Sequence, residues 1–329
     1  MARMSLLEYT RSEAPDGSQA DIAEVMNEVG TMVQDAHVKP SNALLGNTTV
    51  IRKTLPTFAS VKINQGVTPS ITSTEQKVDT IGMFEGAAET DARFPGILGM
   101  ADFEKRRKAD LMAFVEVATQ TMHQYLLYGS TLTDEAGFDG FMPRLDSLNT
   151  TDYSTSIVAS MGSVTGSDGC SVLIVDWGEN ACSLIFPKNS VAGIETIDEG
   201  KVPVLDSDSK RFMAYLTTLR WKVGLGVEDR RHMGRLANID TSDSLLASPT
   251  QGNLYRELTK VLNKMPDPGT AQRVMYVPID LYTALWLQAM EKSNLQLTLQ
   301  EYLGKMEPHF MGWPFRKVQR MTIAESTVS

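Results

Sequence analysis

The sequence has few residues that could bind a transition metal, with only two cysteines and four histidines among 329 residues. Eleven residues, including a predicted turn, separate Cys170 from Cys182. None of the HExxH, CxxC or DxDxDG spacings occurs, and the histidines are scattered at His37, His123, His232 and His309. These absences argue against the common zinc and calcium motifs, and we expect both cysteines to be small buried thiols.

Long hydrophobic runs are also missing. No apolar stretch approaches the roughly 18 residues of a membrane-spanning helix, and the N-terminus lacks the apolar stretch of a signal peptide. We therefore expect no membrane association and synthesis in the cytoplasm. The length allows roughly two to three structural units of about 100 to 200 residues each.

An excess of positive charge is absent too. Lys and Arg total 31 against 40 Asp and Glu, which gives a net charge of -9. This balance argues against a dedicated nucleic-acid-binding protein, although a local basic strip stays open.

Catalytic patterns are lacking as well. No Ser lies in a GxSxG nucleophile elbow, and the carboxylates show no spacing typical of an acid and base pair. The pair Gly224 and Gly226 suggests a nucleotide loop, but the third glycine is missing and Glu228 and Asp229 would repel a phosphate. We expect no catalytic residue, no cofactor site and no metal site.

The segment from Thr48 to Gly86 favours strands but has little material for a core of its own. Eight of its 39 residues are Thr and 13 are apolar, whereas 42% of the whole chain is hydrophobic. Apolar and polar residues alternate over 59–64, turn residues follow, and a second extended run covers 71–81. The pattern predicts a long hairpin arm. Because an isolated hairpin is marginally stable, the arm must lie on its own body or on a neighbouring copy.

Two helices are predicted in the N-terminal half. A short apolar stripe indicates one over 21–36. A much longer helix is predicted over 101–128 and is ended by Gly129, because apolar residues recur there at helical spacing: Leu111, Val115, Ala118, Met122 and Tyr125.

The densest basic run in the chain opens this long helix and consists of Lys105, Arg106, Arg107 and Lys108. Four consecutive residues point around more than a full helical turn, so they cannot form one flat patch. Two interpretations stay open: a solvated helix end, or a contact with nucleic acid or another subunit.

The rest of the chain is predicted to form strands and then a mixed unit. Residues 171–175 and 181–186 are typical of strand, turn and strand. Every odd position from 213 to 227 is apolar or Thr, which predicts one strand of about 50 Å, crossing an elongated domain with a bend at 224–226. From 241 onward we expect a compact α+β unit, with a helix over 254–262, a strand over 274–277, a helix over 279–290 and a last strand over 315–321.

Several of these pieces, in order between Thr57 and Val318, match one known family. They are 58–66 with 84–86, 101–129 followed by 141–145, 177–178 with 186–188, 221–225 leading to 235–239, and 312–318. Together they resemble the major capsid proteins of tailed bacteriophages, in particular the coat proteins of the short-tailed phages. In that family the segment around 177–188 is a hairpin and 312–318 is a closing strand.

The resemblance implies an α+β, Hong Kong 97-like capsid fold. It predicts an N-terminal arm, an extended hairpin loop, a peripheral domain with a spine helix and long strands, and an axial-type domain. The corresponding ranges are 1–46, 47–95, 96–240 with the spine helix at 101–129, and 241–329. The long strands precede the axial-type unit here, which leaves open a permuted order of the pieces.

The function implied is that of a shell subunit without enzymatic activity. Many copies would assemble, as hexamers and pentamers, into an icosahedral phage head that encloses double-stranded DNA by weak, non-specific contact. Scaffold and portal proteins are the implied partners, with a cement or decoration protein as a further one. The protein would be located in the virion, after assembly in the cytoplasm of the bacterial host.

Two sets of residues are predicted to act in assembly. The expected contacts between subunits are Phe58, Val61, Lys62, Ile63, Lys77 and Phe84, and the expected inward basic strip is Lys105, Arg106, Arg107 and Lys108. Two other functions stay open at this point. An encapsulin-like protein compartment would have the same fold, and a nucleotide-dependent enzyme would use Gly224 to Gly226.

Overall fold

The computed structural model describes residues 31–44, 46–148, 157–161, 169–205, 208–240, 252–290, 297–302 and 305–329. Its helices are α2 (Thr31–Asp35), α3 (Phe94–Leu98), α4 (Met100–Tyr128), α5 (Phe141–Arg144), α6 (Gly252–Lys264) and α7 (Ile279–Met290), with a 3-10 turn, η1 (Arg230–His232). Its strands are β1 (Val38–Pro40), β2 (Gly46–Thr54), β3 (Ser73–Asp91), β4 (Ile157–Ser160), β5 (Gly169–Trp177), β6 (Cys182–Phe186), β7 (Ile194–Leu205), β8 (Arg211–Val227), β9 (Met233–Asp240), β10 (Gln272–Val277), β11 (Leu297–Tyr302), β12 (Lys305–Phe310) and β13 (Trp313–Lys317).

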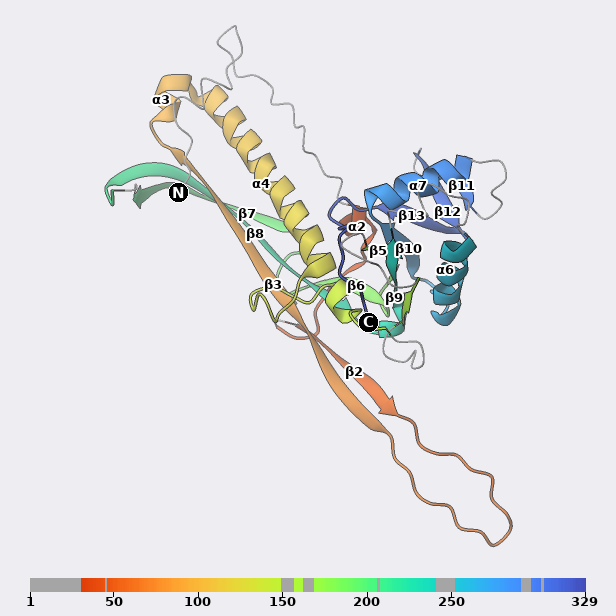
Figure 1. The fold of residues 1–329 in the computed structure, drawn as a ribbon. Helices are drawn as coiled ribbons and strands as arrows, with labels where there is room; N and C mark the ends of the chain where they lie inside the picture. The colour runs from red at the N-terminus through yellow and green to blue at the C-terminus, as the bar shows by residue number, and fades with distance from the viewer. Residues whose placement is uncertain are drawn as a thin grey trace.

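The described strands join into one sheet of 13 strands, whose main path runs β11-β12-β13-β10-β5-β6-β8-β3-β2. Figure 1 shows the result: β3 and β8 cross the molecule beneath α4, a compact group around α6 and α7 lies at one side, and β2 and β3 project away from the body. The mixed α+β class predicted from the sequence is confirmed.

The long strand predicted over 213–227 is confirmed as β8, which has 17 residues. It pairs with β3 from Ala214 opposite Asp91 to Gly224 opposite Ile81, and then with β6. Gly224 lies where these strands meet, and a Cβ there would come 2.4 Å from the backbone oxygen of Thr80. This glycine is therefore explained by close strand packing inside a sheet, and no phosphate-binding turn is formed.

The long helix predicted over 101–128 is confirmed as α4, whose 29 residues span about 43 Å. Its C-terminal half packs on the core, where Met122, Leu126 and Leu127 are fully buried. A Cβ on Gly140 would come 2.4 Å from the carbonyl oxygen of Tyr125 at the helix end, so only glycine lets the returning chain pack this closely. Of the short helix predicted over 21–36, only α2 falls within the described residues.

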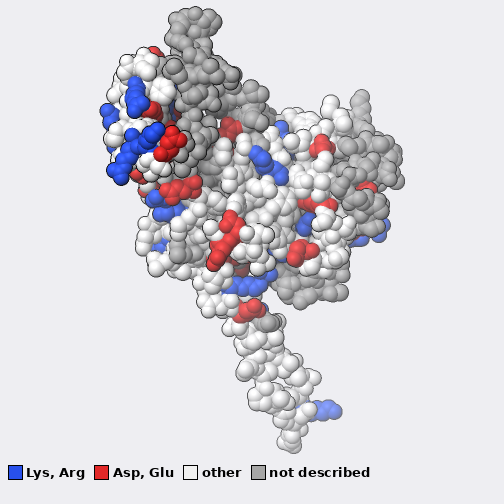
Figure 2. Space-filling model, turned by 60° about the vertical axis from the view of Figure 1, so that its left-hand side comes forward, with Lys and Arg blue, Asp and Glu red and all other residues white. Residues whose placement is uncertain are grey.

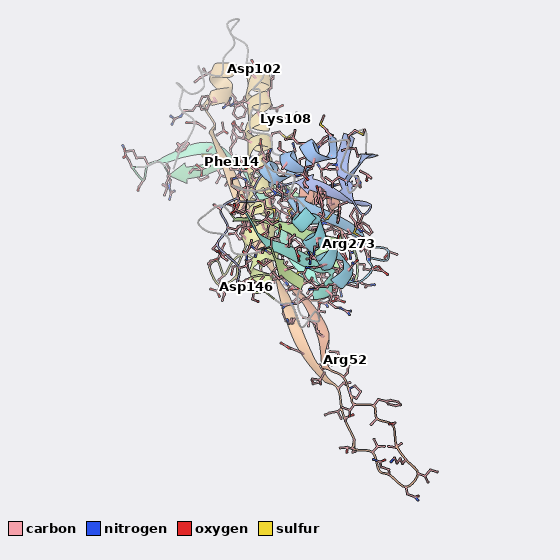
Figure 3. The ribbon with its side chains drawn as sticks, turned by 45° about the vertical axis from the view of Figure 1, so that its right-hand side comes forward. Arg52, Asp102, Lys108, Phe114, Asp146 and Arg273 are labelled. Atoms are coloured by element: carbon pink, nitrogen blue, oxygen red, sulfur yellow. The ribbon has the colours of Figure 1, made fainter. Side chains whose placement is uncertain are left out.

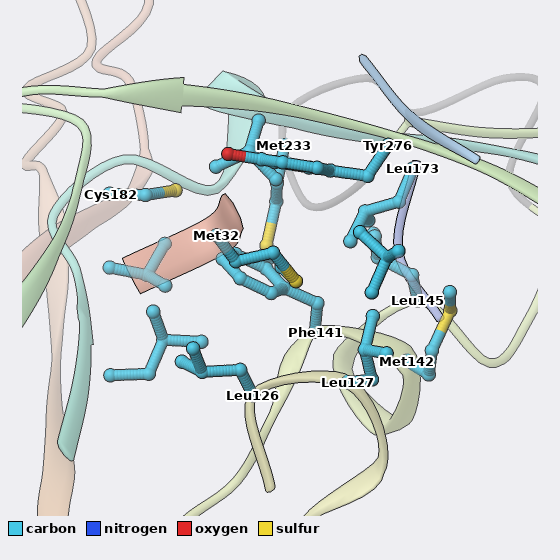
Figure 4. Packing of buried hydrophobic residues seen from close by; sticks show 14 of the residues in the cluster. Met32, Leu126, Leu127, Phe141, Met142, Leu145, Leu173, Cys182, Met233 and Tyr276 are labelled. Atoms are coloured by element: carbon cyan, nitrogen blue, oxygen red, sulfur yellow. The ribbon is translucent and has the colours of Figure 1, made fainter. Parts of the chain in front are cut away.

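Two hydrophobic clusters form the core. The first gathers side chains from α4, α5 and the central strands, and Figure 4 shows Met32 of α2 lying among them with Phe141 and Tyr276. The second joins α6 and α7 to strands from both halves of the chain. Because β5 pairs with β10, with Val175 opposite Val274, the sheet continues across the predicted division at residue 240.

Three predicted details need correction. The predicted strand, turn and strand exist as β5, a turn and β6, but the two strands pair only at Trp177 opposite Cys182 beside the turn and form no antiparallel hairpin ladder. Most of β6 pairs instead with β1 in parallel and with β8 antiparallel. The last strand, β13, begins and ends earlier than the predicted 315–321. The alternating residues 59–64 form no strand, since the ladder of the hairpin ends at Thr54 opposite Ser73.

The C-terminal residues tie the body together. Glu325 accepts hydrogen bonds from Arg235 at 3.0 Å, from Tyr128 at 3.2 Å and from Ser171. Three residues later, Val328 exchanges two hydrogen bonds of 2.9 Å with the side chain of Asn238. The tail thus joins α4, β5 and β9. No helix in the described ranges is long and apolar enough to span a membrane.

Replacing Trp221 by Ala should destabilise the fold by about 3–5 kcal/mol, because a large side chain that is 9% exposed would leave a cavity in the first cluster. Urea unfolding of the soluble protein measures the loss. Leu132, which is 97% exposed, provides the control substitution to Ala. A Trp221→Ala variant with the unfolding midpoint of the wild type would show that this face carries no core packing.

Replacing Glu325 by Ala should cost about 3–5 kcal/mol, because it leaves the charge of Arg235 buried without its partner. Calorimetric melting measures this effect. The matched control is Glu257→Ala, which removes the more exposed pair with Lys260 and should cost less than about 1 kcal/mol. Equal melting shifts in the two variants would contradict the proposed role of the tail.

Candidate functional site

The main exposed feature of the molecule is a hairpin arm built from β2, the outer half of β3 and the tip that connects them. The two strands pair from Gly46 opposite Thr80 to Thr54 opposite Ser73. Residues 55–72 continue the arm without strand pairing, and Figure 1 shows that this tip extends far from the body. The hairpin predicted from the sequence is therefore present, with its strands placed closer to the body than expected.

The tip of the arm, residues 55–72, exposes large apolar side chains and carries a single charge. Its exposed fractions reach 105% for Phe58, 94% for Ile63 and 88% for Ile71. Lys62 is the one charged residue in 55–72, and Figure 2 shows the corresponding single blue side chain near the end of an otherwise white projection. Large apolar side chains that stay in contact with water on a projecting segment are typical of a protein–protein contact surface.

Local hydrogen bonds shape the tip without burying these side chains. The backbone N–H of Gln65 donates to the carbonyl oxygen of Lys62 at 3.1 Å, and the N–H of Lys62 donates to the Gln65 side chain at 3.2 Å. Asn64 between them has a φ of 69°, a left-handed conformation that Asn adopts more readily than most residues. Further back, Ser70 exchanges hydrogen bonds with the backbone of Thr57.

Four of the predicted contact residues, Phe58, Val61, Lys62 and Ile63, lie together at the exposed tip. Lys77 lies instead on β3 at the base of the arm, half-buried, where burial and then the charge of Arg230 lower the pKa of its ammonium group.

Phe84 has a different environment from the tip residues. Its ring packs edge-on against Tyr125 of α4, with ring centroids 4.8 Å apart, and against Phe138 at 6.1 Å. These contacts belong to the first hydrophobic cluster. The structure thus gives Phe84 a role inside the subunit, and we leave it out of the proposed contact surface.

The four residues of the predicted basic strip point to different sides of α4 and have different environments. Arg107 turns to the long strands, donating to Asp198 at 2.9 Å and Thr217 at 2.7 Å and covering the ring of Tyr215. Arg106 pairs with Asp110 on the same helix at 3.3 Å.

Lys105 and Lys108 are the two exposed members of the run, and Figure 3 shows Lys108 on the outer half of α4. Half of the run therefore supports the subunit itself. The other half is exposed to solvent.

One group of residues in the body has the composition of a catalytic set. His232 lies 2.7 Å from the buried Asp176, and the thiol of Cys182 lies 3.9 Å from the backbone oxygen of His232. Burial raises the pKa of the Cys182 thiol far above its ordinary value, so the thiol stays protonated and is a poor nucleophile. Asp176 in turn accepts two hydrogen bonds, of 2.7 and 2.8 Å, from Arg273. The arrangement is that of a buried structural network.

The sequence analysis missed the polar residues at the base of the arm. Asp79 on β3 accepts from Arg144, and Glu228 after β8 accepts from Lys39 and Asn47. The carboxylate of Glu228 was considered only as a group that would repel phosphate. The described residues contain no group of three or more His, Cys, Asp or Glu side chains arranged to hold a metal ion.

The family model for major capsid protein GP7 matches residues 14–329. A chain from the structure of bacteriophage Epsilon15 is 23% identical, and the match covers 100% of this chain and 98% of that chain with a TM-score of 0.78. The capsid of bacteriophage JBD30 is 10% identical, with 98% and 100% of the two chains covered and a TM-score of 0.50. A search of curated protein sequences gave no match.

The structural likenesses concern the fold, whereas the family match covers nearly the whole sequence. Both agree with an arm whose tip exposes apolar side chains and projects away from the described part of its own body. The chain belongs to the major capsid protein GP7 family and is a subunit of the icosahedral head of a bacteriophage.

Proposed function

We propose that the subunit builds the phage head mainly by placing the tip of its arm, residues 55–72, on a neighbouring copy of the chain. The observation that supports this proposal is the exposure of Phe58, Ile63 and Ile71 on a segment with a single charge. Burial of one such side chain contributes about 1.5–3 kcal/mol. Because each copy in a closed shell gives and receives such a contact, modest single contacts add up to a stable particle.

The outer half of α4 is the proposed receiving surface. Met112 in this half is 63% exposed, and Val117 just beyond the middle of the helix is 57% exposed. The nine residues of β2, eight of them paired with β3, carry the tip about 30 Å from the body, which allows contact with a neighbour's helix. Apolar side chains on both partners, with few charges to desolvate, favour this pairing.

Several wider features of the assembly are also part of the proposal. The copies form hexamers and pentamers in the head, and scaffold and portal proteins assist assembly in the bacterial cytoplasm. A decoration protein is a further proposed partner, since a JBD30 capsid with a TM-score of 0.51 to this chain is described as decorated with minor capsid protein trimers.

Contact with the packaged DNA is proposed to be weak. Lys105 and Lys108 are the exposed cations of the basic run on α4, and the whole chain carries a net charge of -9. Two lysines neutralise few phosphates, so the binding they support is sequence-independent and sensitive to salt. A shell built from subunits with few exposed cations and a negative net charge encloses DNA without binding it tightly.

The subunit is further proposed to carry no enzymatic activity. The glycines at 224 and 226 lie inside a strand, and the thiol of Cys182 is held protonated by burial. Both features argue against the nucleotide-dependent enzyme considered from the sequence. The match to a phage capsid family favours the phage head over the encapsulin-like compartment.

Replacing Phe58, Ile63 and Ile71 together by Ser should leave the subunit folded but unable to form shells. None of the three side chains is buried in its own subunit, so the circular dichroism spectrum and melting temperature should stay those of the wild type. Light scattering and electron microscopy should detect no particles. The matched control replaces the exposed arm residues Thr68 and Thr72 by Ser, and this variant should assemble normally.

Deleting the tip should have the same effect as the triple substitution, provided that the deletion ends before Ser73. Ile81 is 7% exposed and pairs with Gly224, so a deletion that extends to it would remove part of the body. Shells of normal yield from the tip-deleted protein would contradict the proposed function.

A further inference from the structure

The arm has no separate hinge segment at its base. β3 runs without interruption from Ser73 to Asp91, pairing with β2 up to Thr80 and with β8 from Ile81 onward. The direction of the arm therefore depends on what holds the strands at the point where β3 leaves the sheet. Two carboxylates, Asp79 and Glu228, lie at this point.

Asp79 fixes the β3 side of the arm. Its Oδ1 accepts from Nη1 of Arg144 at 2.6 Å, and its Oδ2 accepts from the backbone N–H of Val227 at 2.9 Å. The side chains of Asp79 and Arg144 are 11% and 9% exposed, so water screens this ion pair little. Arg144 also donates to the backbone oxygens of Asp139 and Leu225, which anchors it in the body.

Glu228 fixes the β2 side. Its Oε1 accepts from Nζ of Lys39 at 2.7 Å and from Nδ2 of Asn47 at 2.9 Å, and its Oε2 accepts from Oγ1 of Thr49 at 3.3 Å. Asn47 and Thr49 belong to β2, whereas Lys39 belongs to β1 in the body. Burial alone raises the pKa of the Glu228 carboxyl, but the hydrogen bonds from Lys39 and Asn47 outweigh it and hold the pKa below its ordinary value.

We propose that Asp79 and Glu228, with the donors they bind, form an arm-base clamp that fixes the direction of the arm before assembly and thereby positions its tip for a neighbouring copy. The second part of this inference rests on the proposed function of the tip.

The physical reason is that the two carboxylates act on opposite strands. Charge-assisted hydrogen bonds to ionised groups are stronger and more directional than neutral ones. Bending the arm toward either face lengthens the hydrogen bonds on one of its two strands. Both carboxylates are also bound to residues of the body, which do not move with the arm. Without the clamp, β2 and β3 would remain paired with each other but would swing as a unit about Thr80.

The first test measures the arm in the unassembled subunit, at a protein concentration below that needed for shells. Spin labels are placed on cysteines introduced at Thr74 on the arm and Leu287 on α7, both of which are exposed. The native Cys170 and Cys182 are 1% and 0% exposed, and burial raises the pKa of Cys170 to about 12, so neither competes for the label. Electron–electron double resonance then gives the distribution of distances.

Glu228→Gln is the main variant, because this side chain is 30% exposed and its replacement keeps its size. Loss of the charge should broaden the distance distribution and speed hydrogen exchange of the β2 amides about tenfold. Asp229→Asn is the matched control: its carboxylate binds Arg231 beside the clamp, and the distribution should stay narrow. Asp79→Asn provides a second variant with the same expected broadening.

Assembly provides the second measurement. If the arm of Glu228→Gln points in the productive direction only a tenth of the time, the initial rate of shell formation falls about tenfold. Unchanged distances in both clamp variants would overturn the proposal. A broadened distribution with an unchanged assembly rate would overturn the positioning role. The proposed function of the tip is tested separately. It fails if the variant with Ser at positions 58, 63 and 71 still forms shells.

Discussion

The continuous course of β3 is the constraint on which the rest of the structure depends. A strand of 19 residues is shared between the core and the arm, so the arm begins directly at the core sheet with no loop between them. The inner half pairs with β8 beneath α4, and Phe84 of this half packs on the helix. The arm is consequently an extension of the core sheet, and its apolar tip is displayed by a rigid body.

Buried ion pairs join segments that are distant in the sequence. Arg235 with Glu325, Arg273 with Asp176 and Arg316 with Asp35 each connect strands of the sheet to a different part of the chain. A buried ion pair contributes little net stability, because desolvation of the charges offsets their attraction. Removing only one partner of the pair destabilises the fold, because the other charge stays buried and unpaired. Such pairs therefore specify which segments of the chain meet. In this subunit they specify where the C-terminal tail and the segment around α2 lie.

Local patterns predicted the elements that have strong periodicity. The apolar stripe of α4 and the alternation in β8 gave both elements nearly their observed bounds, since apolar residues recur at helical spacing in α4 and at alternate positions in β8. The Thr-rich residues that form the outer half of β3 gave a weaker signal, because both faces of the arm meet water. The turn between β5 and β6 was predicted, but the hairpin ladder expected between them was wrong because their main partners, β9, β10 and β8, are far away in the sequence.

The sequence by itself determined that the chain has a mixed α+β fold with a long helix, a long strand and a projecting hairpin, because composition and periodicity are local properties. Its role as a shell subunit followed from the resemblance of several ordered segments to a known family. Tertiary structure alone decided which predicted contact residues point outward. In the folded subunit, Phe58 and Ile63 are exposed, Phe84 packs on the core, and Arg107 donates a hydrogen bond to Thr217 of the same subunit. Tertiary structure also brought Glu228 to the base of the arm. The placement of Phe84, Arg107 and Glu228 depends on contacts between residues far apart in the sequence, such as Phe84 with Trp221, and no local pattern encodes such contacts.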